Sequence, residues 1–140
     1  MLGWRAGGNL MTVFSAPDKI DFLARARDAG YFVRVFFIGT KDPKINAARV
    51  AGRVMEGGHT VPIEKIVSRY VRSMANLSGA IALADRVYVY DNSIDGKEAS
   101  LCARTEDGLL RKVYASLPDW VAEATSALER HAEFVDLRAA

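Results

Sequence analysis

Cysteine, long apolar runs and excess charge are all scarce in this 140-residue sequence. Cys102 is the only cysteine, so the chain cannot form an internal disulfide, which favours a reducing compartment. No His and Asn pattern accompanies it, which argues against a catalytic thiol. Apolar runs stay below the about 18 residues that span a bilayer, and no continuous apolar stretch of a signal peptide precedes Gly7. We therefore expect a cytoplasmic protein without a membrane segment.

Charge of one sign is also nearly absent, because 19 Lys and Arg residues face 17 Asp and Glu residues and leave a net charge of +2. Such a weak long-range field argues against binding to nucleic acid or to an anionic membrane. No second His, Cys or carboxylate cluster stands at metal-ligand spacing from His59, so no metal site is expected. With 50% hydrophobic residues, the chain can bury one core and predicts a single domain over residues 1–140.

The first part of the chain predicts an irregular lead-in at residues 1–10, a short strand at 10–14 and a helix from Pro17 to about Ala29. Residues 31–38, YFVRVFFI, form a nearly unbroken apolar and aromatic run. A run of this kind is typical of a strand covered on both faces, as in a parallel sheet packed between helices. We expect it to be the central strand of the fold.

Helical patterns follow on both sides of the short segment GGHT. The first covers residues 44–55, and the second begins at Pro62 and continues into a further helical piece at 77–84. Alternation then predicts a strand at 86–90, and Asp107-Gly108 predicts a two-residue hairpin turn between strands 99–106 and 109–114. A last helix is expected from Pro118 through His131. These alternating elements predict an α/β fold with a parallel core.

Basic residues recur on both helices that flank GGHT. Arg49 and Arg53 are four residues apart and share one helix face, while Lys65, Arg69 and Arg72 form a stripe on the next helix. If the two helices fold together, the guanidinium groups can converge on the oxygens of a polyphosphate. The alternative is that both stripes are solvated helix faces with Glu56 and Glu64 as local partners.

The same region resembles a known family. The pattern RVxxRVxxGGHxVPxxxIxxRYxRSxxNL at residues 49–77, followed by ALADRVYVYDNS at 82–93, is similar to the predicted ATPases related to zeta toxin, which are P-loop kinases. The resemblance implies a three-layer kinase core with a mobile lid at about residues 44–76. It also implies ATP with Mg²⁺ as cofactors, and a nucleotide or a UDP-sugar such as UDP-N-acetylglucosamine as ligand.

Site residues follow from this resemblance position by position. Arg53 and Arg69 would stabilise transition-state charge, and a wider set would bind the nucleotide or its phosphates: Arg49, Arg53, His59, Arg69, Arg72 and Asn92. Asp91 and Ser93 would lie near the base, or form an ordinary Asx turn with Asn92. His59 could instead fix a turn, and Gly57-Gly58 could be a lid hinge or a simple helix end.

The resemblance lacks its phosphate-binding part. No GxxxxGK[ST] loop is present, and Met11-Thr12 stands where relatives often have Glu-Thr. We therefore expect a truncated kinase domain that is inactive alone and possesses, at most, nucleotide or phosphate binding. The alternative is a non-catalytic module that binds a protein partner. An uncovered sheet edge would favour a homodimer in either case.

Overall fold

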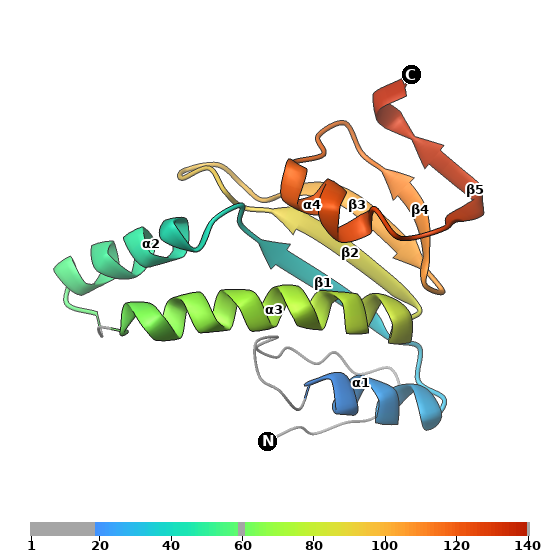
Figure 1. The fold of residues 1–140 in the computed structure, drawn as a ribbon, viewed down its shortest axis with the longest axis horizontal. Helices are drawn as coiled ribbons and strands as arrows, with labels where there is room; N and C mark the ends of the chain where they lie inside the picture. The colour runs from blue at the N-terminus through green and yellow to red at the C-terminus, as the bar shows by residue number, and fades with distance from the viewer. Residues whose placement is uncertain (1–18, 59–60, 140) are drawn as a thin grey trace.

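The protein is described here by a computed structural model that places residues 19–58 and 61–139. Figure 1 shows helices gathered against one twisted sheet. The elements, in chain order, are α1 (Lys19–Asp28), β1 (Arg34–Gly39), α2 (Pro43–Met55), α3 (Ile63–Leu83), β2 (Arg86–Asp91), β3 (Ser100–Glu106), β4 (Leu109–Val113), α4 (Asp119–Thr125), β5 (Arg130–Asp136) and the 3₁₀ turn η1 (Leu137–Ala139). The expected lead-in at residues 1–10, the strand at 10–14, the start of the first helix and His59 lie outside the described residues.

The sheet is mixed rather than parallel. Its five strands follow the order β1-β2-β3-β4-β5, with parallel pairs β1/β2 and β4/β5 and antiparallel pairs between them. The α/β class predicted from sequence is confirmed, and of the predicted parallel core only the β1/β2 and β4/β5 pairs are parallel. Two crossovers join neighbouring parallel strands directly along the chain, one from β1 through α2 and α3 to β2 and one from β4 through α4 to β5. Strand β3 runs antiparallel between β2 and β4.

One face of the sheet carries the hydrophobic core. Helices α1, α3 and α4 lie over this face (Figure 1), where Leu77 of α3 and Val121 of α4 pack with Val87 and Val89 of β2. Those valines are completely buried, as alternate residues on one side of a strand should be. No helix of the described residues covers the opposite face. Within that part of the chain, the fold therefore has two layers, where the sequence predicted three.

Strand β1 is an edge strand of the sheet that the described residues form, which differs from the central position predicted for residues 31–38. Within the described sheet it pairs only with β2. Phe37 points to the core and is 4% exposed, whereas Phe36 and Ile38 on the other face are each 61% exposed. The apolar character of residues 31–38 therefore did not mean that both faces of the strand are buried. The predicted homodimer stays a prediction, and the exposed β1 edge is the feature that would favour it.

The C-terminal part also differs from its prediction. Helix α4 ends at Thr125, and the chain continues into β5, so His131 belongs to a strand and not to an apolar helix stripe. Strand β5 pairs with β4 in parallel, with Lys112 opposite Val135. This pairing decides the structure of residues 130–136, although the helix predicted from Pro118 continued through His131. The predicted hairpin is confirmed, because Asp107 and Gly108 join β3 to β4 with φ of 52° and 80°.

Helices α2 and α3 match their predicted positions, with one difference. Asp42 caps α2 by accepting a hydrogen bond from the Lys44 amide at 2.8 Å, and Pro43 occupies the first turn. Gly57 has a φ of 91° and follows the end of α2, which matches the interpretation of Gly57-Gly58 as a helix end. The helix after Pro62 is a single helix of 21 residues, whereas the sequence predicted a separate helical piece at 77–84. None of the helices in the described ranges combines the length and apolar character needed to cross a lipid bilayer.

Candidate functional site

A cleft of about 360 Å³ opens between α2, α3 and the carboxyl end of β1. It lies where β1 and β2 run in parallel, and the carboxyl ends of parallel strands are the usual ligand position in open α/β sheets. Ile66 and Met74 of α3 contribute apolar lining, and Arg49, Arg53 and Arg69 contribute three cations. Arg49 and Arg53 of the first predicted stripe therefore meet Arg69 of the second in one cleft.

Arg49 is the arginine of the cleft that is fixed by protein contacts. Its Nε donates to Asp95 Oδ1 at 2.9 Å, and its Nη2 donates to the carbonyl oxygen of Asn92 at 2.7 Å. Its side chain is 29% exposed. These contacts link α2 to the segment after β2, so Arg49 contributes positive charge to the cleft from a restrained position.

Arg53 and Arg69 are different, because neither forms an ion pair or a side-chain hydrogen bond with the described residues. Both are exposed, and both line the cleft, one from the last turn of α2 and the other from the first half of α3. A guanidinium group carries five donors and is permanently charged. The donors of these two side chains are therefore available to a ligand that enters between the helices.

Neutral polar groups form the end of the cleft nearest β1. Thr40 Oγ1 donates to Asn46 Oδ1 at 2.6 Å, and the Tyr70 hydroxyl donates to the Thr40 carbonyl oxygen at 2.8 Å. Burial, followed by the negative charges of Asp42 and Asp91, raises the pKa of Tyr70 above its ordinary value. Tyr70 therefore stays protonated at neutral pH and acts here as a hydrogen-bonding and packing group rather than as a base.

The segment after β2 is held by Asp91. Its Oδ1 accepts hydrogen bonds from Trp120 Nε1 at 2.8 Å and from Ser93 Oγ at 2.5 Å. The Asn92 amide donates to the Gly39 carbonyl oxygen at 2.8 Å, which joins the ends of β1 and β2. The contacts of Asp91 and Ser93 thus match the turn interpretation, while Asn92 also lines the cleft.

The sequence did not connect Trp120 with the segment after β2 and indicated it only as part of the last predicted helix. Its ring packs so closely that a Cβ added at Gly39 would lie 2.8 Å from it. The signal for this contact is Gly39 itself, a glycine at the end of an apolar strand, where another group often approaches the backbone closely.

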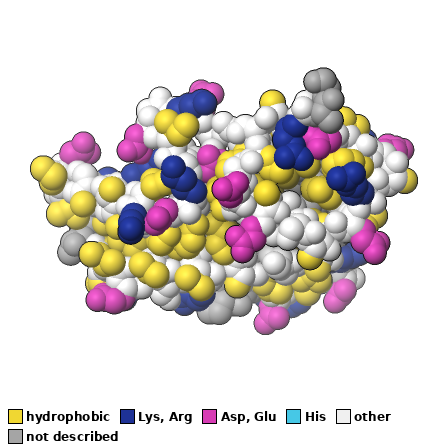
Figure 2. All heavy atoms as spheres, turned by 45° about the horizontal axis from the view of Figure 1, so that its top comes forward, with side chains coloured by type: hydrophobic (Ala, Val, Ile, Leu, Met, Phe, Trp, Pro, Cys, Tyr) yellow, Lys and Arg dark blue, Asp and Glu magenta, His cyan; other side chains and the backbone are white. Residues whose placement is uncertain are grey.

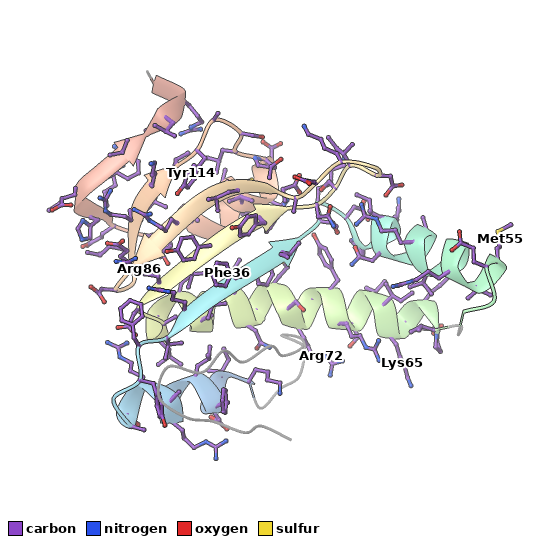
Figure 3. The ribbon with its side chains drawn as sticks, turned by 180° about the vertical axis from the view of Figure 1, so that it is seen from behind. Phe36, Met55, Lys65, Arg72, Arg86 and Tyr114 are labelled. Atoms are coloured by element: carbon purple, nitrogen blue, oxygen red, sulfur yellow. The ribbon has the colours of Figure 1, made fainter. Side chains whose placement is uncertain are left out.

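Arg72 does not line the cleft, although the sequence grouped it with Arg69. Figure 3 shows Lys65 and Arg72 pointing away from α2, on the far side of α3. Their spacing of seven residues keeps them on one stripe of the helix, and Arg69 lies at the side of that stripe nearest α2. The structure therefore brings together Arg49, Arg53, Arg69 and Asn92 and leaves Arg72 outside.

Comparisons with protein-family models, with curated proteins and with solved structures give no match. The resemblance to kinases related to zeta toxin stays a hypothesis that rests on the residues alone. Within the described residues, no group of three or more His, Cys, Asp or Glu side chains is placed to hold a metal ion. The site is thus defined by its arginines.

Proposed function

We propose that this chain binds the phosphate groups of a nucleotide or similar polyphosphate in the cleft between α2 and α3. The observation that carries the proposal is the pair Arg53 and Arg69, which face one cleft and make no ion pair within the described residues. Their forked donors suit phosphate oxygens, and bidentate contacts of this kind are among the strong hydrogen bonds in proteins.

Arg49 supports the same proposal from a fixed position. Because its contacts to Asp95 and Asn92 hold it beside the cleft, the site has one preorganised cation and two that can adjust to the ligand. Preorganisation lowers the entropy that binding costs. The cleft volume of about 360 Å³ is at the lower end of the range for small-molecule sites, which fits a phosphate chain better than a whole nucleotide sugar.

Binding without phosphoryl transfer is the form of activity that these residues favour. Among the described residues, the cleft lining contains no carboxylate that could accept a proton from an acceptor hydroxyl. The raised pKa of Tyr70 removes the one phenol of the lining as a base. No GxxxxGK[ST] loop is present in the sequence to hold phosphates and Mg²⁺. We therefore propose a nucleotide-binding relative of a kinase rather than a kinase.

Calorimetric titration tests this proposal. The full chain is titrated with tripolyphosphate, ATP and UDP-N-acetylglucosamine, each with and without Mg²⁺. We expect saturable binding of tripolyphosphate and ATP, and about tenfold or greater weakening by Arg53→Ala or Arg69→Ala, since each removes a charge-assisted contact. Binding should also raise the melting temperature of the native chain.

Lys65→Ala is the matched control, because Lys65 belongs to the same helix as Arg69 but points away from the cleft (Figure 3). This variant should bind tripolyphosphate like the unmodified chain. Equal weakening by Lys65→Ala would indicate nonspecific attraction of anions to the helix. A folded chain that releases no heat with any of the three ligands would reject the proposal.

A further inference from the structure

The uncovered face of the sheet carries a continuous row of side chains across four strands. Strand register places Phe36 beside Tyr88, Tyr88 beside Arg104, and Arg104 beside Lys112. Directly paired residues project to the same face of a sheet. Figure 3 looks onto this face and shows Phe36, Arg86 and Tyr114 on strands or strand ends that α3 does not cover. We call this surface the open face.

Two aromatic rings stack on each other at the β1 side of the open face. The rings of Phe36 and Tyr88 are stacked, with centroids 5.0 Å apart and an angle of 10° between their planes. Phe36 is 61% exposed, and Phe32, just before β1, is 56% exposed. At the other side, the Tyr114 ring lies 5.1 Å from Lys112 Nζ. Phe32 and Phe36 therefore offer exposed ring surface to a ligand, while Tyr88 and Tyr114 are partly buried.

Positive charge exceeds negative charge on this face. Glu106 lies within ion-pair distance of Arg86, Arg104 and Arg111, at 3.4, 3.8 and 3.6 Å. Arg111 also pairs with Glu133 at 3.3 Å. One carboxylate shared among three guanidinium groups leaves uncompensated charge even when the second carboxylate is counted.

Two further cations of the open face have no carboxylate partner within the described residues. The Arg34 guanidinium carbon lies 5.2 Å from the Phe32 ring centroid, and Lys112 lies over Tyr114 as described above. Both contacts are cation–π interactions, which orient a cation beside an aromatic surface without neutralising it. The row across the open face therefore begins with two rings, Phe36 and Tyr88, and continues with two cations, Arg104 and Lys112.

We propose that the open face binds single-stranded nucleic acid, with bases stacked on Phe36 and Tyr88 and phosphates contacting Arg34, Arg104 and Lys112. Base stacking on aromatic side chains beside a positively charged groove is the general chemistry of single-strand binding. The row from Phe36 to Lys112 crosses three strand intervals, about 14 Å. This length accommodates two or three unstacked bases on a sheet surface.

The small net charge of +2 predicted no nucleic-acid binding, but it averages over the whole chain. Folding separates the charges, and among the described residues the open face gathers the cations Arg34, Arg86, Arg104, Arg111 and Lys112. Glu106 and Glu133 pair with some of them, and the negative charge of Asp107 acts on Arg86, which leaves Arg34 and Lys112 without an ion pair in this part of the chain. A nucleic-acid strand supplies both flat bases and phosphate charge, which matches the two components of this surface. An apolar protein partner would match only the rings.

Fluorescence anisotropy with labelled oligo(U) and oligo(dT) of about 12 nucleotides tests the proposal on the full chain. We expect saturable binding of these strands in preference to a duplex of equal length, and weaker binding as salt rises. Phe36→Ala should weaken binding about tenfold by removing a stacking surface, whereas Tyr88→Phe should retain it because the ring remains. Arg34→Gln and Lys112→Gln should reduce the dependence of affinity on salt.

Two variants elsewhere on the surface are matched controls. Ile63→Ala removes an apolar side chain that is 66% exposed, and Arg72→Gln removes a guanidinium group on the far side of α3. Both should bind the strands like the unmodified chain, and circular dichroism should show all variants folded. Arg53→Ala and Arg69→Ala should also leave strand binding unchanged, which separates this test from that of the cleft.

Three outcomes would overturn the proposal. The first is the absence of an anisotropy change with folded protein at low salt. The second is binding that is lost in Arg53→Ala or Arg69→Ala but kept in Phe36→Ala, which would place the strand in the cleft. The third is a dimer by light scattering that Phe36→Ala converts to a monomer, which would make the open face an interface between two copies of the chain.

Discussion

Arginines of similar sequence context have different surroundings in this protein. Arg49 is held by Asp95 and Asn92, while Arg53, one helical turn later, lines the same cleft without such contacts. The four-residue spacing predicted that they share a face, because that follows from helix geometry alone. Which of them has a carboxylate partner depends on Asp95, which is 46 residues away from Arg49 along the chain.

Two residues of the sequence pattern that resembles the relatives of zeta toxin also make structural contacts within the chain. The Tyr70 hydroxyl donates to the Thr40 carbonyl oxygen, and Asp85 Oδ2 accepts a hydrogen bond from the Val33 amide at 2.7 Å. Each side chain joins α3 or β2 to the chain near β1. These contacts give a physical role to pattern residues whether or not a ligand binds.

Cys102 yields a prediction at the residue scale. Its side chain is 0% exposed, and burial raises the pKa of the Cys102 thiol above its ordinary value. A thiol-specific reagent at about pH 8 should therefore react with the native chain far more slowly than with the chain in denaturant. Rapid and complete reaction of the native chain would contradict the burial of Cys102.

The sign of the pH dependence follows from the same shift. A raised pKa means that the folded state keeps the thiol proton to higher pH than the unfolded state does. The retained proton stabilises the folded state relative to the unfolded state. This contribution is fully present below the ordinary thiol pKa and is lost as the pH rises through the folded-state pKa of Cys102. The difference in unfolding free energy between the unmodified chain and Cys102→Ala should therefore become smaller in alkaline solution.

At the scale of elements, the β3–β4 hairpin was predictable because its turn chemistry is local. Asp107 and Gly108 have positive φ, as a two-residue turn between twisted strands requires. Helix α2 was predictable for the same kind of reason, since Asp42 and Pro43 start it and Gly57 ends it. By contrast, β5 depends on pairing with β4, and its own residues also fit a helical pattern.

The two glycines Gly108 and Gly52 give opposite predictions. Gly108→Ala places a side chain at φ of 80°, which should destabilise the protein by about 1 kcal/mol. Gly52→Ala, within α2, meets nothing within 4 Å and should stabilise the protein by up to about 1 kcal/mol. Urea denaturation of both variants measures the two effects. A stabilising Gly108→Ala would contradict the positive-φ turn.

At the scale of the whole molecule, stability should be uneven. Strand β2 is paired on both sides and contains the completely buried residues Val87 and Val89, whereas α2 has no buried residue. Hydrophobic side chains lie on the surface around the α2–α3 end of the molecule (Figure 2). Met55, the last residue of α2, is 89% exposed. The helix that carries Arg49 and Arg53 is therefore the least anchored of the long elements.

Amide hydrogen exchange measures this gradient. We expect amides of α2 to exchange fastest among the long helices and amides of β2 to exchange slowest, because local opening of α2 exposes little apolar surface. Tripolyphosphate should slow exchange in α2 if the proposed cleft binds it, since binding favours the closed arrangement of the helices. Equal protection of α2 and β2 would contradict the uneven packing described here.

The sequence by itself determined the local features of this protein: the α/β class, the positions of α2 and α3, the hairpin at Asp107-Gly108, and the helix faces that carry Arg49, Arg53 and Arg69. These features follow from spacing, capping and turn residues that act over a few positions. Only the tertiary structure decided that β1 lies at the edge of the described sheet, that β5 is a strand, and that Arg72 points away from the cleft. Strand order and the meeting of distant side chains depend on long-range packing, which short sequence patterns do not contain.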